Sequence, residues 1–180
     1  MLQGIAVRDA RIEDAAHIAE IHVRAWQRGY AGLMPESVLN SLSISDREVF
    51  WQGRLRSGDV TVLVSEVGNH VTGWMVLGRS RDEDADESVV EMYGLYVDPR
   101  HWRQGSGAVL WSEAERRLAT SSFDRVTLWV LEGNSGARRF YEAIGFILDP
   151  QKVKTIEREG VQLPECRYGR HVSRRGTESA

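Results

Sequence analysis

The chain has 180 residues, 42% hydrophobic and 27% charged, with a formal net charge of -3 at pH 7. This composition is that of a folded globular domain, and it lacks the Lys and Arg excess of nucleic-acid-binding proteins. The single cysteine, Cys166, excludes an internal disulfide. Because neither a secretory signal nor an apolar run of membrane-spanning length is visible, we expect a cytoplasmic protein that binds neither nucleic acid nor membrane.

The N-terminal part of the chain predicts one strand followed by three helices. A short strand begins at Ile5, and the run 10–26 carries apolar residues at helical spacing. Pro35 suits the first turn of a short helix, and residues 45–58 predict a longer helix that Ser45 caps. The strand and helices are therefore expected to precede the main part of the sheet.

The middle of the chain predicts a hairpin and a further strand. Two β-rich runs over residues 61–79 flank a Gly-Asn-His turn, which is typical of a hairpin. An acidic stretch at 81–88 is interpreted as a solvated loop, although it would also attract a cationic amine. The next strand is expected at 89–97, where Gly94 indicates a bulge or a packing accommodation.

The C-terminal part alternates helices and strands. The predicted elements are a helix ending near residue 120, a strand at 125–131, a helix at 135–145, and strands at 146–150, 152–156 and 166–172. This order predicts one mixed α/β domain over residues 1–172, with residues 173–180 as a disordered tail.

A basic, glycine-rich turn, HWRQGSGAVL at 101–110, precedes one of these helices. Backbone N–H groups at a helix N-terminus, beside glycines that permit close approach, form an anion site, most often for phosphate. A tight turn that needs the glycines only for their dihedral angles is the alternative. The stretch lacks the lysine of a P-loop, and Leu110 stands where a dinucleotide fingerprint needs Gly or Ala.

Two separated motifs resemble the GNAT superfamily of acetyl-CoA-dependent N-acetyltransferases. The first is VDP at 97–99 followed by WRQGSG at 102–107, similar to the family's pyrophosphate motif except that Trp102 replaces the usual Gln or Arg. The second is N-x-x-A-x-x-F-Y-E-x-x-G-F, from Asn134 to Phe146. The resemblance implies a mixed, mostly antiparallel sheet with helices on both faces and a splayed central pair of strands.

The resemblance also implies acetyl-CoA as co-substrate and no metal. Amides of the glycine turn would bind the pyrophosphate, and the pantetheine arm would lie along the strand at 89–97. The residues expected to bind CoA are Leu95, Tyr96, Val97, Arg103, Gln104, Gly105, Ser106, Gly107, Ala108, Asn134, Ala137 and Arg138.

Acyl transfer needs a neutral amine, a stabilised oxyanion and a proton for the departing thiolate. Glu91 shares a strand face with Tyr93, Leu95 and Val97 by the period-two rule. An acid in such an apolar row would have a raised pKa and act as a general base, directly or through water. The alternative interpretation of Glu91 is a surface carboxylate. The competing bases are His22 on the first helix and bulk water.

Tyr141 is the expected proton donor to the thiolate, because a phenol with a pKa near 10 stays protonated at working pH. Trp26 and Tyr30 are expected to line the acceptor pocket. Since Cys166 matches no family role, we expect direct transfer in a ternary complex to a small-molecule, protein or peptide amine. The alternative function is a non-catalytic acetyl-CoA-binding module that regulates a partner. The family also implies a homodimer.

Overall fold

A computed structural model of the protein describes residues 4–173, so most of the predicted tail, residues 174–180, lies outside the described residues. The strands are β1 (Ile5–Asp9), β2 (Thr61–Val67), β3 (His70–Arg79), β4 (Val89–Val97), β5 (Arg125–Leu131), β6 (Ile147–Arg158) and β7 (Val161–His171). They form a seven-stranded sheet in the order β1-β2-β3-β4-β5-β7-β6. Neighbouring strands are antiparallel except β4 and β5, which confirms the predicted mixed, mostly antiparallel fold.

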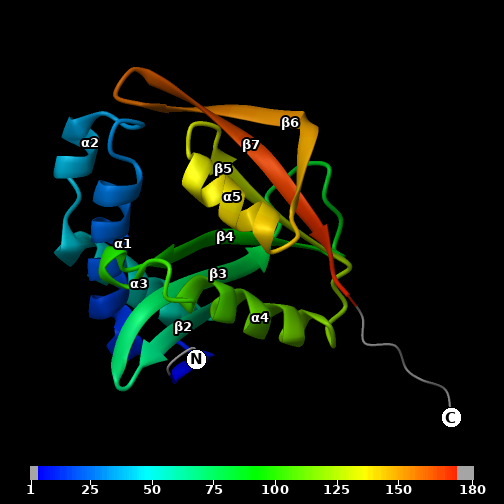
Figure 1. Cartoon of the computed structure of the whole chain (residues 1–180), viewed down its shortest axis with the longest axis horizontal. Coiled ribbons are helices and arrows are strands. Elements are labelled where there is room, and N and C mark those ends of the chain that lie inside the picture. The colour runs from blue at the N-terminus through cyan, green and yellow to red at the C-terminus, as the bar shows by residue number, and fades with distance from the viewer. Residues whose placement is uncertain (1–3, 174–180) are drawn as a thin grey trace, which may run out of the picture.

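Helices cover both faces of this sheet (Figure 1). They are α1 (Ala15–Gly29), α2 (Glu36–Asn40), α3 (Ile44–Ser57), α4 (Ser106–Leu118) and α5 (Ser135–Ala143), with 3-10 turns η1 (Ile12–Asp14) and η2 (Pro99–His101). In β2, Val62 and Val64 pack in the core beneath α1 and α3, whereas Leu63 between them packs in the core beneath α4 and α5. The period of two along a strand therefore supplies both cores from one sheet.

The start of α3 differs from the prediction. Ser43, not Ser45, is the cap: its backbone is extended, and its hydroxyl accepts from the Asp46 N–H at 3.1 Å. Ser45 lies inside the first turn, where a side chain can no longer reach the free N–H groups that a cap satisfies. Gly58 ends the helix in the left-handed conformation, with φ 66°.

The central strands β4 and β5 separate along their length. They pair from Val89–Arg125 to Met92–Leu128, and beyond that point both strands continue while their ladder ends. The predicted splayed central pair is therefore confirmed. A C-terminal hairpin of β6 and β7 extends the sheet beyond β5 (Figure 1).

A bulge in β4 reverses the alternation of its side chains. In β3, Val76 pairs with Gly94 and Leu77 pairs with Met92, so Tyr93 is the extra residue. Tyr93 packs with the α1 and α3 core, whereas Leu95 packs with the α4 and α5 core.

The prediction that Glu91 shares a face with Leu95 and Val97 is therefore wrong. The extra residue of the bulge moves both of them to the other side of the sheet, while Glu91 and Tyr93 remain on one face. The bulge expected at Gly94 is present.

Neither a bilayer-crossing helix nor a metal cluster occurs among residues 4–173. No helix in that range is both long and apolar enough to span a membrane. No three His, Cys, Asp or Glu side chains in that range are grouped to hold a metal ion. The thiol of Cys166 is buried and donates to the Val130 carbonyl at 3.6 Å, and burial raises its pKa.

Candidate active site

The first turn of α4 packs against the splayed part of β4. A Cβ on Gly107 would lie 3.1 Å from Cζ of Phe140 and 3.5 Å from Cδ2 of Leu95, so a side chain at this position would crowd the Phe140 ring. Gly105 precedes the helix at φ 99° and Arg103 lies at φ 60°, both in the left-handed region. This backbone brings the free N–H groups of a helix N-terminus beside the splay.

Side chains hold the glycine turn from beneath. Ser106 is buried, and its hydroxyl lies 3.2 Å from the Thr72 hydroxyl, so only its backbone N–H is available to a ligand. Asp98 accepts from the backbone N–H of Arg100 at 2.9 Å and from its guanidinium at 2.7 Å. The Arg100 side chain lowers the pKa of Asp98 to about 2, which keeps this anchor ionised.

Trp102 occupies the position where the motif usually has Gln or Arg. Its indole N–H donates to the Val97 carbonyl at 2.7 Å, and 41% of the residue is exposed. The Gln104 amide donates to the carbonyl of Arg100 at 3.1 Å. The departure from the motif therefore places an aromatic ring at the end of β4.

The second motif begins α5. Asn134 caps this helix, because its side-chain oxygen accepts from the Ala137 N–H at 3.1 Å. Arg138 donates to the Tyr168 hydroxyl at 3.0 Å and to the Glu132 carbonyl at 3.1 Å. Two of its nitrogens therefore already have partners within the protein, and its contact with CoA stays a prediction.

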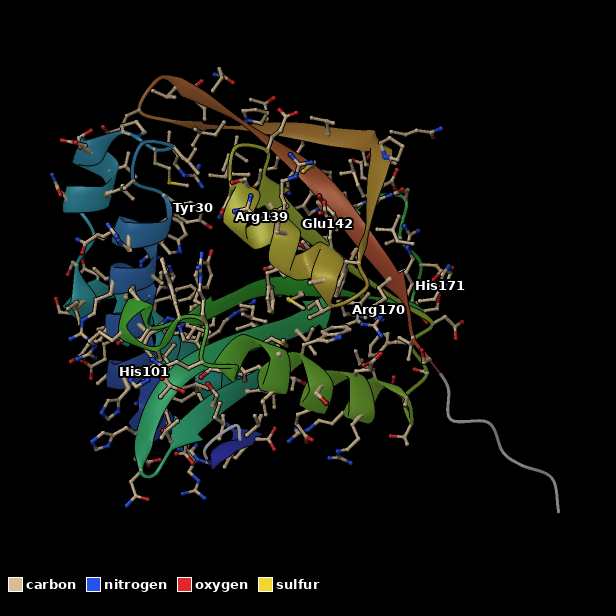
Figure 2. The ribbon with its side chains drawn as sticks, in the orientation of Figure 1. Tyr30, His101, Arg139, Glu142, Arg170 and His171 are labelled. Atoms are coloured by element: carbon tan, nitrogen blue, oxygen red, sulfur yellow. The ribbon has the colours of Figure 1, made fainter. Side chains whose placement is uncertain are left out.

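Three phenols lie around the splay. Tyr141 of α5 is buried, and burial, with a smaller contribution from Tyr96, raises the pKa of its hydroxyl. The Tyr96 and Tyr30 hydroxyls lie 2.9 Å apart, and burial also raises the pKa of both. Figure 2 shows Tyr30 at the end of α1, on the side of α5. All three phenols therefore stay protonated at neutral pH.

His22 belongs to the aromatic wall beneath α1. Its Nδ1 accepts from the Trp51 indole at 3.3 Å, and the Trp26 and Tyr96 rings lie 5.1 and 5.8 Å from it. Burial, and then the charge of Arg47, lowers its pKa to about 3. His22 is therefore neutral at pH 7, and its Nδ1 lone pair is already engaged. Trp26, expected to line an acceptor pocket, also packs edge-to-face on Tyr30 at 5.2 Å.

Glu91 is 1% exposed and forms an ion pair with Arg81. One carboxylate oxygen accepts from the Arg81 backbone N–H at 2.9 Å and from its Nε at 3.2 Å, and the other accepts from Nη2. The Arg81 guanidinium also lies 4.2 Å from the centre of the Tyr93 ring. Glu91 therefore contacts a guanidinium and not the apolar side chains that were expected around it. Its role as general base stays a prediction.

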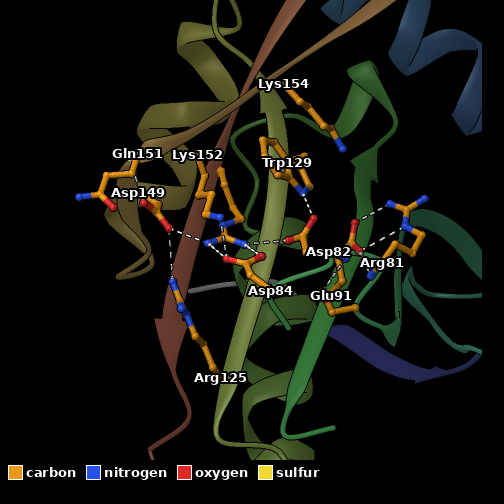
Figure 3. Close-up of polar contacts among 12 residues, drawn as sticks. Arg81, Asp82, Asp84, Glu91, Arg125, Trp129, Asp149, Gln151, Lys152 and Lys154 are labelled. Carbon is orange, nitrogen blue, oxygen red and sulfur yellow. Dashed lines mark hydrogen bonds and ion pairs between the residues drawn. The ribbon is translucent and has the colours of Figure 1, made fainter. Parts of the chain in front are cut away.

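Two aspartates of the exposed acidic loop are tied to the sheet. Arg167 of β7 is buried and donates to Asp82 at 3.1 Å, Asp84 at 2.7 Å and Asp149 at 2.8 Å (Figure 3). We call these four residues the Arg167 cluster. It borders a cavity of about 600 Å³, whose other charged residues are Arg81, Glu83, Glu91, Lys152 and Lys154.

Sequence reasoning missed the Arg167 cluster. Its signal was a single arginine between two apolar residues in a strand, and its partners lie up to 85 positions away. The interpretation of residues 81–88 as a solvated loop holds for Glu83, Asp86 and Glu87, which are exposed. It missed that Asp82 and Asp84 pair with Arg167, because a buried arginine needs carboxylate partners.

Comparisons with known proteins agree with this geometry. The sequence model of the acetyltransferase (GNAT) family matches residues 15–146. The chain is 33% identical to the uncharacterised N-acetyltransferase YuaI of Bacillus subtilis, over 92% of each chain. It is 26% identical to the L-amino acid N-acyltransferase MnaT of Escherichia coli, over 82% of each. Its fold matches the PaiA N-acetyltransferase of Thermoplasma acidophilum in complex with coenzyme A, with a TM-score of 0.70, 22% identity, and coverage of 93% of this chain and 99% of that one.

Proposed function

The chain belongs to the acetyltransferase (GNAT) family, and from that premise we propose that it moves the acetyl group of acetyl-CoA directly to a primary amine within a ternary complex. The splay carries the proposal: β4 and β5 separate beyond Met92 and Leu128, beside the N-terminus of α4. An unpaired strand edge offers hydrogen bonds to the amide groups of an extended pantetheine arm. A helix N-terminus offers N–H groups and a favourable dipole to a pyrophosphate.

In this proposal CoA lies across β4 and α4. Leu95, Tyr96 and Val97 supply the strand edge, and the backbone of 103–108 supplies the N–H groups. At the start of α5, Asn134, Ala137 and Arg138 border the arm from the other side. Trp102 must leave the Val97 carbonyl, or share it, if the arm bonds to that oxygen.

Tyr141 is the proposed acid. The amine nitrogen attacks the thioester carbonyl carbon, a C–N bond forms, the C–S bond breaks, and the CoA sulfur takes the phenolic proton. Burial keeps the Tyr141 hydroxyl protonated until the thiolate develops. The buried thiol of Cys166 is not needed as an intermediate carrier.

The proton of the acceptor is the second requirement. We keep Glu91 as the proposed base, acting through water, because Arg81 already occupies both of its oxygens. His22 is a poorer candidate because it is neutral, buried and bonded to Trp51 through Nδ1. A non-catalytic acetyl-CoA-binding module would need neither a buried phenol nor a base, and it is the weaker alternative.

A screen of amines tests the proposal. Purified protein is incubated with acetyl-CoA and each amine, and release of free CoA is followed. L-amino acids come first, because MnaT, a relative of this chain, is named as an L-amino acid N-acyltransferase. Small-molecule amines and peptides follow. Parallel calorimetric titrations with acetyl-CoA, NAD and ATP are expected to give binding of acetyl-CoA alone, and preferential binding of NAD would overturn the assignment.

A further inference from the structure

Lys154 of β6 is held between an aromatic ring and a carboxylate. Its Nζ lies 4.2 Å from the centre of the Trp129 ring and 3.4 Å from a carboxylate oxygen of Glu165. Figure 3 shows the lysine side chain beside the Trp129 ring. An indole face and a carboxylate together are the chemistry that recognises an alkylammonium ion.

This arrangement stands next to the point where the sheet opens. Trp129 is the first residue of β5 beyond the last pair with β4, at Leu128. Because Leu128 and Val130 pack in the core beneath α4 and α5, the Trp129 side chain faces the opposite side. In the proposed function the cofactor lies beneath α4 and α5 on the other side, so the acceptor reaches the thioester from the side that Trp129 faces.

Glu165 of β7 lies on the same side and close to the predicted acceptor residues. It pairs with Leu131 across the ladder, and Leu131 packs with Trp26 and Tyr30. Its carboxylate is near enough to add to the effect of burial in raising the pKa of Tyr30 and Tyr96. Glu165 therefore lies on the side of the sheet that carries Leu131 and Lys154, near Trp26 and Tyr30.

The other cations around the cavity have closer partners. Arg81 is paired with Glu91, Arg167 with three aspartates, and Lys152 with Asp84 at 3.0 Å. Lys154, by contrast, is held at a longer distance from Glu165, 3.4 Å, and its side chain is 42% exposed. A lysine on an exposed strand can turn into water at small cost.

We propose that Trp129 and Glu165 form the subsite for the ammonium group of the acceptor, and that Lys154 fills it until the acceptor takes its place. This inference rests on the proposed function, since it names how the same site binds its amine. The acceptor enters as an alkylammonium ion and loses its proton beside the splay before attack. Lys154 therefore competes with the acceptor for this subsite.

Indole N–H resonances give a site-specific test. Protein labelled with 15N-tryptophan is saturated with CoA and titrated with n-butylammonium chloride, and the Trp129 signal is assigned with W129F. The indole N–H of Trp129 is fixed on Asp82 at 2.9 Å, so its shift reports the ring's surroundings. We expect K154M to bind the probe about threefold more tightly, the scale of one exposed cation–π contact. We expect E165Q to bind it about fivefold more weakly.

Lys152→Met is the matched control, because Lys152 lies on the same strand with 41% of its side chain exposed and pairs with Asp84. It should bind like wild type, and n-butanol should shift no signal. Equal affinity of K154M and K152M, or an unchanged affinity in E165Q, would overturn the inference. Acetyl-CoA titration of each protein keeps the two proposals apart: failure of the wild type to bind acetyl-CoA would refute the proposed function, whereas loss of the butylammonium response alone would refute only the subsite.

Discussion

The two sides of the splay present different chemical groups. The proposed cofactor side, formed by the N-terminus of α4, the end of β4 and the start of α5, offers mainly backbone groups held by glycines and caps. The proposed acceptor side, formed by residues 81–91 with Trp129, Glu165 and Arg167, offers side chains in ion pairs. Sites made of backbone groups depend on short sequence motifs, whereas ion pairs join residues that are distant in sequence. The first side can therefore be recognised from sequence, and the second needs the structure.

The largest expected effect is on the cofactor side, at Tyr141. Tyr141→Phe keeps the ring and removes the proton donor, so turnover should fall about 10²-fold while acetyl-CoA affinity is retained. Steady-state kinetics beside calorimetric titration makes the measurement. Near wild-type turnover, or a defect confined to acetyl-CoA affinity, would mean that the phenol is structural.

On the acceptor side, Arg167→Met leaves three carboxylates without their shared partner. The free energy of unfolding at pH 7 should fall by about 2 to 3 kcal/mol, with acetyl-CoA affinity unchanged. Chemical denaturation measures it. An equal loss of acetyl-CoA affinity would show that the two sides are not separable.

The same variant has a pH signature. Arg167 lowers the pKa of Asp84 and Asp149, so the stabilisation is complete above the ordinary aspartate pKa, near 4, and is lost as the pH falls through the lowered values. The wild type should lose this stabilisation as the pH falls below about 4, and Arg167→Met should not.

Gly105→Val tests whether the backbone conformation makes the cofactor side. A β-branched residue is strained at φ 99°, so acetyl-CoA affinity should fall about 30-fold. Gly58→Val is the matched control, because Gly58 has φ 66° at the end of α3. It should reduce stability and leave acetyl-CoA affinity intact. Unchanged affinity in Gly105→Val would mean that the turn serves the fold alone.

The contribution of His22 to the free energy of unfolding should depend on pH. Its pKa of about 3 lies below the ordinary value of 6.5, so the unfolded chain takes up the proton first. Stability is then complete above pH 6.5 and falls as the pH drops below it, by about 2 kcal/mol at pH 5 relative to His22→Gln. His17→Gln, at an exposed position on the same helix, is the control. Parallel denaturation profiles for wild type and His22→Gln would contradict this expectation.

The smallest effect is expected at Glu91. Glu91→Gln keeps hydrogen bonds to Arg81 and removes the charge, so turnover should fall about tenfold, most at neutral pH, with an altered acidic limb. Acetyl-CoA affinity should not change. Wild-type turnover with the same acidic limb would assign the proton to water.

The predictable part of this molecule follows from local physics. The strands at 89–97 and 125–131 and the cap at Asn134 were predictable because apolar runs and capping residues act over a few positions. The side of the sheet on which Leu95 lies could not be predicted, since the bulge in β4 depends on its register with β3. The ion-pair partner of Glu91 could not be predicted either, because the irregular loop between Arg81 and Glu91 has no sequence spacing that would indicate their contact.

The short β4–β5 ladder has a consequence for motion. The half-sheets β1-β2-β3-β4 and β5-β7-β6 share ladder hydrogen bonds only from Val89–Arg125 to Met92–Leu128, so this seam is where the sheet is expected to flex. Amide hydrogens past Met92 on the open edge should exchange with solvent sooner than those of the paired stretch. In the proposed binding mode the cofactor pairs with this open edge, so its binding should both raise the melting temperature and slow this exchange.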